Sequence, residues 1–317
     1  MPELITISIP TYRRPSLLLH ALYSCLLQEY RPLEIDISDD SPCAETEAIV
    51  RSLTLPEGIS LRYWRNSPSL GQAGNVNKLF AEARGAKLIL LHDDDALMPG
   101  AVSVLHDAFS WSDFVVASYG LQLVITENGE SSLRDSNSLN RTRRTPDSAG
   151  LQEDVIEAAL YGQFPNNGYV IKTELARAVG YRGKPDVGEA CDLDFSIRLA
   201  LANRDGAFAF VNQYTSQYRL TSFSLRNTHD VCWKAFDQVS ALRSLTPNQV
   251  SAQQYLLRRL AEEAVVDNAC HHRRLRALQL FFSSFYPKRK LTLKAAYHLG
   301  LIAMPKLSVL RERIRAA

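Results

Sequence analysis

The chain has 317 residues, of which 46% are hydrophobic and 22% charged, with a formal net charge of +2. This composition is ordinary for a globular protein, and the length allows one large domain with an appendage. We expect no membrane-spanning helix, since no run of about 18 apolar residues occurs, and five scattered cysteines without a CxxC pair argue against disulfides or structural zinc. The apolar run at 4–10 has no basic leader, so we expect a cytoplasmic protein without a signal peptide.

Strand-like and helix-like segments alternate through the first 125 residues. Apolar and β-branched runs predict strands at 4–10, 34–38, 60–66, 87–91 and 113–124. Amphipathic periodicity predicts helices at 15–28, 44–53, 72–84 and 99–109. This alternation predicts an α/β fold with a mainly parallel sheet, in which ligands bind beyond the carboxyl ends of the strands.

Two acidic clusters fall at such strand ends. Asp39 and Asp40 follow one strand, and three consecutive carboxylates, Asp93 to Asp95, follow the strand at 87–91. Adjacent negative charges repel one another unless a cation or strong donors balance them, and Mg²⁺ often shares one or two carboxylates with substrate phosphates. A solvated acidic turn before a helix is the alternative, but two clusters at strand ends favour a binding site.

The rest of the chain changes character twice. Residues 126–150 are polar, so we expect either a mobile loop that closes over a substrate or a surface insertion. Helices at 151–160, from Thr173 and at 190–202, with strands at 168–171, 207–211 and 215–220, then return to an α/β pattern, and from His229 onward the pattern is helical. Residues 256–317 hold 13 Lys and Arg against 4 Asp and Glu, a net charge of +9 that leaves −7 for the preceding part.

Five motifs in order resemble the GT-A glycosyltransferases of family 2, over roughly residues 4–225. They are ITISIPTYRRP, EIDISDDSP, Arg65-Asn66 with GQAGNVNKLFAEARGAKLILLHDDD, GEACDLDFSIRLA and QYRLTSFSL. The resemblance implies a GT-A fold, a mainly parallel mixed sheet flanked by helices. It also implies a GT-A catalytic domain at 1–228, followed by a basic helical region at 229–317.

The resemblance also implies roles for individual residues. It places Asp94 as the ligand of a Mg²⁺ or Mn²⁺ ion, with Asp95 in a supporting role, and it places Asp93 near the ribose. His92 stands where many members of the family have the first Asp of a DxD motif. The residues expected to line the nucleotide are Thr11, Tyr12, Asp39, which would contact the base, Asp40 beside it, Asn66, Gly71 and Asn77. Turn formation and helix capping are the alternative roles of the Asp, Asn and Gly residues.

The catalytic base implied by the resemblance is Asp192, which would deprotonate the acceptor hydroxyl. The family usually has Glu where this chain has Cys191. On a helix, Asp194 is turned roughly 200° from Asp192, and a helix-start Asp favoured by the dipole is the alternative. His229 comes later than the His that completes the metal site in some relatives, so we expect a surface residue.

These features predict a metal-dependent inverting glycosyltransferase. It would transfer a sugar from a nucleoside diphosphate sugar to a hydroxyl of a saccharide or lipid-linked saccharide, in cell-surface polysaccharide or glycoconjugate assembly. A non-catalytic nucleotide-sugar-binding protein of the same fold is one rival. A sugar-nucleotide nucleotidyltransferase is another, but the first strand is not followed by a Gly-rich phosphate loop.

The basic C-terminal helices have two interpretations. They either dock on anionic lipid at the inner face of the membrane, near a lipid-linked acceptor, or pack on the core or on a second subunit as in a homodimer. Nucleic acid is not an expected partner, because the charge is modest and no recognition motif is present.

Overall fold

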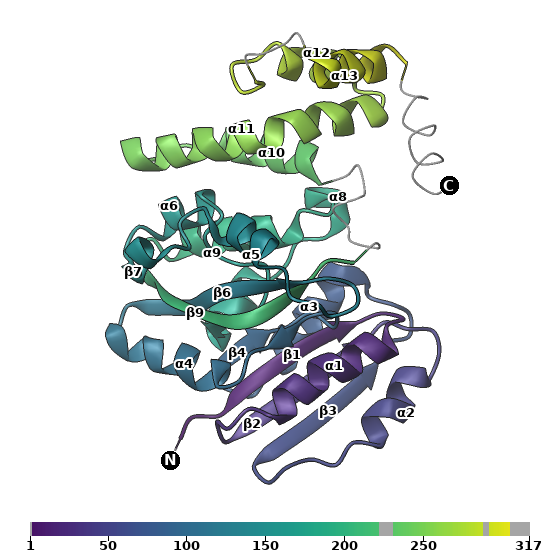
Figure 1. Ribbon diagram of the computed structural model, residues 1–317, viewed down its shortest axis with the longest axis vertical. Coiled ribbons are helices and arrows are strands. Elements are labelled where there is room, and N and C mark those ends of the chain that lie inside the picture. Colours follow the sequence, from purple (N-terminus) through teal and green to yellow (C-terminus); the bar gives the residue numbers. More distant parts are fainter. Residues whose placement is uncertain (1, 222–230, 288–291, 305–317) are drawn as a thin grey trace. The chain divides into compact units, whose positions relative to one another are not determined.

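The computed structural model describes residues 2–221, 231–287 and 292–304 (Figure 1). The described residues divide into two compact units. The first holds the chain up to Gly183 and the stretch that begins at Phe195, and the second holds Lys184–Asp194 and the helices after residue 230.

The first unit is built on a nine-stranded sheet with the order β3-β2-β1-β4-β8-β6-β9-β5, and β7 pairs with β9. The strands are β1 (Ile5–Thr11), β2 (Leu33–Asp39), β3 (Ile59–Arg65), β4 (Lys87–Leu90), β5 (Ala96–Leu97), β6 (Val115–Ile125), β7 (Gly150–Gln152), β8 (Tyr169–Lys172) and β9 (Ala207–Arg219). Strands β1 to β4 run parallel, as do β6 and β9, while β8 is antiparallel to β4 and β6. The predicted mixed α/β sheet is confirmed.

The helices of the first unit connect these strands (Figure 1). They are α1 (Pro15–Leu26), α2 (Glu45–Arg51), α3 (Gly71–Glu82), α4 (Ala101–Asp107), α5 (Leu133–Asn140), α6 (Val155–Leu160) and α7 (Thr173–Val179), with short 3₁₀ turns at Ala108–Trp111 and Pro146–Ser148. Helix α9 (Cys191–Ala202) begins in the second unit and continues in the first.

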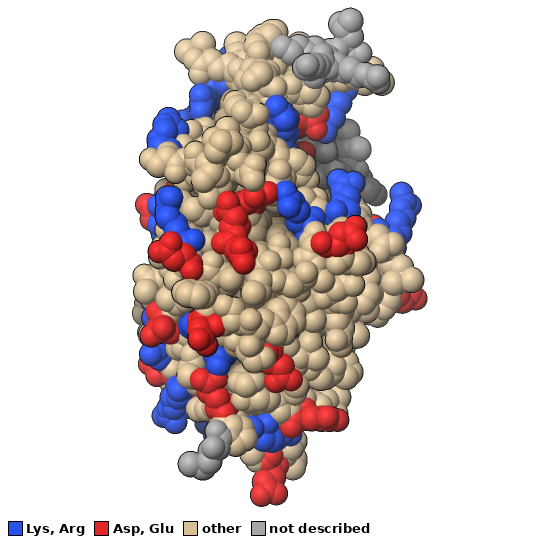
Figure 2. All heavy atoms as spheres, turned by 90° about the vertical axis from the view of Figure 1, so that its left-hand side faces the viewer, with Lys and Arg blue, Asp and Glu red and all other residues tan. Residues whose placement is uncertain are grey.

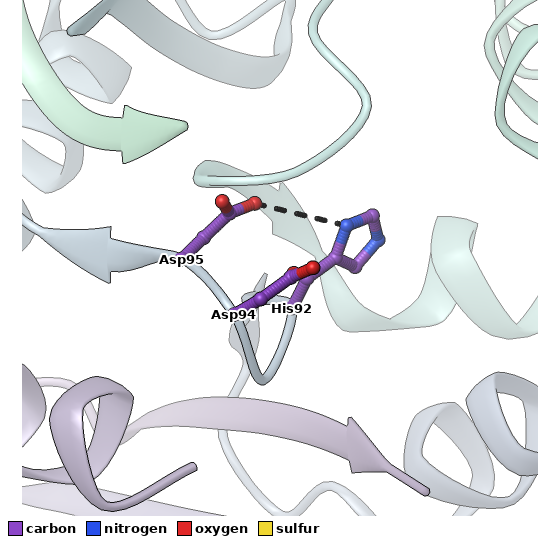
Figure 3. Close-up of side chains that lie close together, drawn as sticks. All are labelled: His92, Asp94 and Asp95. Atoms are coloured by element: carbon purple, nitrogen blue, oxygen red, sulfur yellow. Dashed lines mark ion pairs between the residues drawn. The ribbon is translucent and has the colours of Figure 1, made fainter. Parts of the chain in front are cut away.

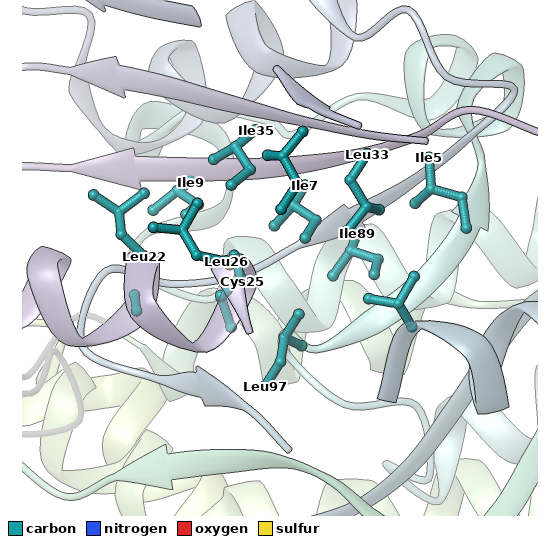
Figure 4. Close-up of a cluster of buried hydrophobic side chains, with 14 of the residues drawn as sticks. Ile5, Ile7, Ile9, Leu22, Cys25, Leu26, Leu33, Ile35, Ile89 and Leu97 are labelled. Carbon is teal, nitrogen blue, oxygen red and sulfur yellow. The ribbon is translucent and has the colours of Figure 1, made fainter. Parts of the chain in front are cut away.

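Alternation along the first two strands explains the main core (Figure 4). Ile5, Ile7 and Ile9 of β1 are fully buried, together with Leu22 and Cys25 of α1. Pro15 at the first turn suits the start of α1, since its fixed φ and missing N–H cost nothing there. The helix therefore begins where the strand–helix connection ends and lays its apolar face on the sheet.

The intervening residues of β1 and β2 are polar and also buried. Glu34 and Asp36 are at most 2% exposed, and both accept hydrogen bonds from the guanidinium of Arg62 on β3, at 2.9 Å and at 2.6 and 2.8 Å. Thr6 donates to Glu34 at 3.0 Å. Burial raises the pKa of Asp36 to about 6 although Arg62 opposes that shift. The network depends mainly on the partly buried guanidinium of Arg62, and the more exposed Arg84 lies 3.9 Å from Glu34.

Arg62→Ala is expected to lower the free energy of unfolding by about 3 kcal/mol, because removing one partner of a buried ion pair leaves the other charge uncompensated. Arg51 is the matched control, since its side chain is 78% exposed and pairs with Glu47 four residues away on α2; Arg51→Ala should cost about 0.5 kcal/mol or less. Urea denaturation of both variants measures the difference. Equal losses would contradict a supporting role for the Arg62 network.

The segment at 126–150, predicted as a mobile loop or surface insertion, contains helix α5, the 3₁₀ turn at Pro146–Ser148 and the first residue of strand β7. Helix α5 is held to β6 through polar contacts: Ser136 Oγ accepts from Val124 N at 2.8 Å, and Asn140 Nδ2 donates to Gln122 O at 2.8 Å. Its buried side chains are polar rather than apolar, so hydrophobic periodicity did not reveal the helix.

The second unit is helical among its described residues, as predicted for the chain after 229. Its helices are α8 (Lys184–Val187), α10 (Cys232–Ala241), α11 (Pro247–Cys270), α12 (Arg274–Phe281) and α13 (Leu293–Ala303). Thr246 starts α11 with a capping box. The buried carboxylate of Asp267 accepts the backbone N–H of Cys232 at 2.8 Å, which satisfies an open donor at the start of α10.

Candidate active site

The three carboxylates after β4 point toward different parts of the first unit. Asp93 turns toward the end of β1, where Thr11 Oγ1 donates to its Oδ2 at 2.7 Å and the backbone N–H of Tyr12 donates at 3.3 Å. Asp93 is 5% exposed and Thr11 is 2% exposed. Thr11 and Asp93, which the sequence placed separately near the nucleotide and near the ribose, are therefore in direct contact across 82 positions.

Asp95 turns the opposite way, toward β9. Its Oδ1 accepts the backbone N–H of Arg219 at 2.7 Å, and its Oδ2 accepts Asn167 Nδ2 at 2.8 Å. Asp95 is 1% exposed and Asn167 is fully buried. The Asn167 contact therefore orients Asp95.

Asp94 lies between these two and remains the more accessible carboxylate, with a side chain 16% exposed. Its oxygen, an oxygen of Asp95 and a ring nitrogen of His92 all lie within 4.8 Å of one another (Figure 3). His92 Nδ1 is 3.8 Å from Asp95 Oδ2. Two carboxylates and an imidazole at this spacing fit a divalent ion such as Mn²⁺ or Mg²⁺.

Burial and mutual repulsion weaken the acidity of this cluster. The pKa of Asp93 is raised to about 6 and that of Asp95 to about 7. Burial is the larger cause of both shifts, and the negative charge of Asp94 is the second. Arg14 opposes the shift at Asp93, and His92 opposes it at Asp95. The site therefore gains negative charge over the neutral pH range, when the two buried carboxyl groups lose their protons.

Through these two carboxyl groups the metal-free protein is expected to lose stability as the pH rises from about 4 to about 7, and this contribution then stays level up to pH 8. A carboxyl group whose folded-state pKa is raised stabilises the fold while it is protonated, and this contribution disappears as the pH passes the folded-state pKa, here about 6 for Asp93 and about 7 for Asp95. Mn²⁺ should restore stability most strongly above pH 7, because it binds ionised carboxylates. Urea unfolding across this range, with EDTA or with Mn²⁺, measures both effects. A metal-free midpoint that rises with pH would contradict the prediction.

The second acidic cluster is buried and already hydrogen-bonded. Asp39 is fully buried, and its oxygens accept from Ser41 N and from Tyr63 Oη, each at 2.8 Å. Asp40 is 5% exposed and accepts from Asn66 Nδ2 at 2.7 Å. It also accepts the backbone N–H of Leu70, directly before α3, with both oxygens at 3.1 Å. Asp40 thus orients the residues immediately before α3. This contact is of the turn-forming and capping kind given above as the alternative role of the Asp residues.

The predicted nucleotide-lining residues on α3 and in the segment before it have different surroundings. Asn66 Oδ1 accepts from Lys78 Nζ at 2.7 Å, next to the Asp40 contact. Gly71 opens α3 at φ +70°, a conformation that favours glycine. Asn77 exchanges two hydrogen bonds with the backbone of Tyr181, at 2.7 and 2.9 Å. Asn66 and Asp40 are therefore brought together, whereas Asn77 fastens α3 to the segment after α7.

The connection after β1 holds residues that sequence reasoning missed. Arg14 Nη1 lies 2.8 Å from Asp94 Oδ2 and 3.3 Å from Asp93 Oδ1. Tyr12 is 50% exposed, and the Arg13 guanidinium lies 5.1 Å from the centre of its ring. Arg14 could have been predicted from two sequence features taken together. Three adjacent carboxylates need a cation to balance them, and the motif after the first strand contains two arginines.

The candidate base belongs to the second unit, whereas the carboxylates Asp93 to Asp95 belong to the first. Asp192 lies in the first turn of α9 and is half-buried. The nearby Glu189 pairs with Lys184 at 2.5 Å, and Asp194 is buried. Cys191 is buried too, which raises the pKa of its thiol and makes it a poor nucleophile. His229 lies outside the described residues.

Comparisons with known proteins agree with this architecture. Staphylococcus aureus TarS 1-349 in complex with UDP superposes with a TM-score of 0.59 at 12% identity, covering 94% of this chain and 87% of that one. Mannosyltransferase PcManGT from Pyrobaculum calidifontis, in complex with GDP-Man and Mn²⁺, gives a TM-score of 0.53 at 17% identity, covering 96% and 86%. The first unit thus carries the fold of the GT-A glycosyltransferases.

Sequence comparison then gives the family. Residues 6–161 match the model of glycosyl transferase family 2. An uncharacterised protein of Mycobacterium tuberculosis is 29% identical over 225 residues, covering 69% of this chain and 68% of that protein. The GalNAc(5)-diNAcBac-PP-undecaprenol beta-1,3-glucosyltransferase of Campylobacter jejuni is 34% identical over 105 residues, covering 33% of this chain and 34% of that enzyme. Residues 6–161 therefore resemble glycosyl transferase family 2, and together with the named relatives this match supports a glycosyltransferase.

Proposed function

We propose that this protein is a divalent-metal-dependent, inverting glycosyltransferase. It would move one sugar from a nucleoside diphosphate sugar to a hydroxyl of a saccharide or lipid-linked saccharide, in the assembly of a cell-surface polysaccharide or glycoconjugate. The observation that carries the proposal is the juxtaposition of His92, Asp94 and Asp95 beyond β4, close to the hydrogen-bonded pair of Thr11 and Asp93.

The named relatives support a donor of this class. TarS was solved with UDP and with UDP-GlcNAc, and PcManGT with GDP-Man and Mn²⁺. The Campylobacter enzyme is named for a polyprenyl-diphosphate-linked glycan. All three names fit a nucleoside diphosphate sugar donor, and the last fits a lipid-linked acceptor.

The residues divide the work as follows. Asp94 would hold the ion with Asp95 and His92, and the bound ion would supply charge neutralisation on the departing diphosphate. Asp93, oriented by Thr11, would contact the ribose.

The nucleoside side of the site would lie beside the second acidic cluster. The side of the site that faces the nucleobase would be formed by Asp39 and Asp40, together with Asn66, Gly71 and Asn77. Tyr12 would lie near the nucleotide. Because the protein already uses both oxygens of Asp39, a contact with the base would use a remaining lone pair on them.

Asp192 would accept the proton of the acceptor hydroxyl as general base. A carboxylate is a suitable base when it lies within hydrogen-bond reach of that hydroxyl. Attack from the face opposite the departing diphosphate would invert the configuration at the anomeric carbon.

An NMR assay tests the proposed reaction. UDP-, GDP- and TDP-sugars are incubated with octyl glycosides, whose apolar chain stands in for a lipid, with Mn²⁺ or with EDTA. We expect one donor class to yield an extended glycoside of inverted anomeric configuration only when metal is present. Retention of configuration, or equal yield in EDTA, would contradict the proposal.

We further propose that residues 1–228 form the catalytic domain and that the helical region at 229–317 docks on an anionic membrane from the cytoplasmic side. Exposed apolar side chains on or next to α12 and α13 support this role: Leu275 (78%), Phe282 (62%), Leu293 (92%), Leu299 (39%) and Met304 (59%). From His271 to the end the sequence has 11 Lys and Arg against one acidic residue, which suits an anionic surface. No helix among the described residues is long and apolar enough to span a bilayer. Elsewhere, charges of both signs are interspersed over the face shown in Figure 2.

Vesicle sedimentation tests the docking proposal. The full chain should pellet with phosphatidylglycerol-containing vesicles and not with phosphatidylcholine alone, and Leu293→Glu with Phe282→Glu should lower the bound fraction several-fold. Phe114→Glu, at a side chain 67% exposed in the first unit, is the matched control. A dimer in solution that the double variant dissociates, without vesicle binding, would show that the apolar face serves a second copy of the chain instead.

A further inference from the structure

The most accessible carboxylate of the proposed metal site already has a cation beside it. Arg14 Nη1 contacts Asp94 Oδ2 at 2.8 Å and Asp93 Oδ1 at 3.3 Å. The backbone of Arg14 is fixed, because the residue immediately precedes α1 and Pro15 opens that helix. Its side chain is 33% exposed, so the guanidinium can turn away from Asp94 without disturbing the core.

A guanidinium and a divalent ion compete for Asp94, because both draw on the lone pairs of one carboxylate and their positive charges repel each other. Metal ligands lie roughly 2.1 Å from Mg²⁺, and at that range a guanidinium on the same carboxylate would meet a double positive charge. Asp93 and Asp95 do not offer the same freedom, because each is buried and held by backbone N–H groups. Binding of an ion at Asp94 is therefore opposed by Arg14 and becomes tighter when the guanidinium moves away.

We propose that Arg14 is an internal counter-ion that competes with the divalent ion for Asp94 and passes to the donor's diphosphate when the ion binds. This proposal rests on the function proposed above. Arginine binds phosphate oxygens through a planar fork of N–H groups, so the diphosphate that accompanies the ion offers the displaced side chain a new anionic partner. Metal and nucleotide would then bind far better together than either would alone.

The neighbouring Arg13 provides a contrast. It carries the same charge one residue away, but its guanidinium lies over the ring of Tyr12, and its backbone N–H donates to Ser41 Oγ at 2.7 Å. The two arginines of the motif therefore have different partners, and only the competition at Arg14 should affect metal binding directly.

Mn²⁺ binding by electron paramagnetic resonance tests the proposal without any activity assay. Free Mn²⁺ is titrated with the full chain, with and without UDP or GDP, for wild type, Arg14→Gln, Arg14→Lys and Arg13→Gln. Removal of the competitor should make Arg14→Gln bind Mn²⁺ alone about 10-fold more tightly than wild type, within the usual range of coupling between sites. The enhancement of Mn²⁺ affinity by the nucleotide should shrink by a similar factor, whereas Arg14→Lys, which keeps the charge, and Arg13→Gln should resemble wild type.

The outcomes separate this proposal from the function on which it rests. Equal Mn²⁺ affinity in wild type and Arg14→Gln, or weaker binding by folded Arg14→Gln, would overturn the role of Arg14 while leaving the metal site in place. Failure of all four proteins to bind Mn²⁺, with or without nucleotide, would overturn the metal site and the counter-ion together. Thermal melts of each variant confirm that the comparison is made between folded proteins.

Discussion

Asp94→Asn is expected to lower metal-dependent sugar transfer by about 10²–10³-fold, the loss typical when one group that stabilises developing charge is removed. Among the residues that the structure describes, no backbone donor holds the Asp94 carboxylate, which is 16% exposed, in contrast to Asp93 and Asp95. The variant should therefore lose Mn²⁺ affinity while Asp93 and Asp95 keep their positions. Donor consumption and Mn²⁺ titration measure the two losses.

The fold of Asp94→Asn should be at least as stable as that of wild type without metal, because the substitution removes a charge that repels Asp93 and Asp95. Asp113→Asn, at an exposed position before β6, is the matched control and should change neither quantity. Wild-type Mn²⁺ affinity and turnover in folded Asp94→Asn would contradict the assignment of Asp94.

Asp192→Asn is expected to lower turnover by about 10²–10⁴-fold, the usual contribution of a general base. Donor affinity should stay within about twofold of wild type, because the proposed role of Asp192 concerns the acceptor proton and not the nucleotide. Single-turnover kinetics gives the chemical step, and titration with the nucleoside diphosphate and Mn²⁺ gives the affinity.

Two nearby acids provide the comparison for Asp192. Glu189→Gln breaks an ion pair with Lys184 and should leave the chemical step intact. Asp194→Asn alters a buried side chain, so its effect should appear in stability before it appears in turnover. A full loss of transfer in Glu189→Gln, with Asp192→Asn active, would assign the base to Glu189.

Local patterns were sufficient to predict the first half of the fold. The alternating isoleucines of β1 and Pro15 at the start of α1 are signals within a few residues, and both elements lie where the sequence predicted them. Helix α5 was missed because its buried residues are polar and act through contacts with β6. The strands predicted at 207–211 and 215–220 form one long strand, β9, which depends on pairing with β6 and not on local composition.

The candidate site was predictable in location but not in its internal arrangement. Three adjacent aspartates after an apolar strand indicate a site at the carboxyl edge of the sheet. The partners that separate them come from distant segments, Thr11 for Asp93 and Asn167 with Arg219 for Asp95. Which carboxylate stays accessible therefore depends on tertiary contacts that adjacency in sequence does not contain.

The measurement that tests the central claim most directly is a thermal-shift screen of UDP, GDP, TDP and CMP, each with Mn²⁺, Mg²⁺ or EDTA, on wild type and Asp94→Asn. A ligand specific to the folded state stabilises it by about 2.7 kcal/mol at 100 times its Kd. We predict that one nucleoside diphosphate raises the melting temperature of wild type only with a divalent ion, and that Asp94→Asn loses this shift. If no nucleotide shifts the wild-type melting temperature with any metal, or if the shift persists in EDTA and in Asp94→Asn, the carboxylates after β4 are not a metal-dependent donor site.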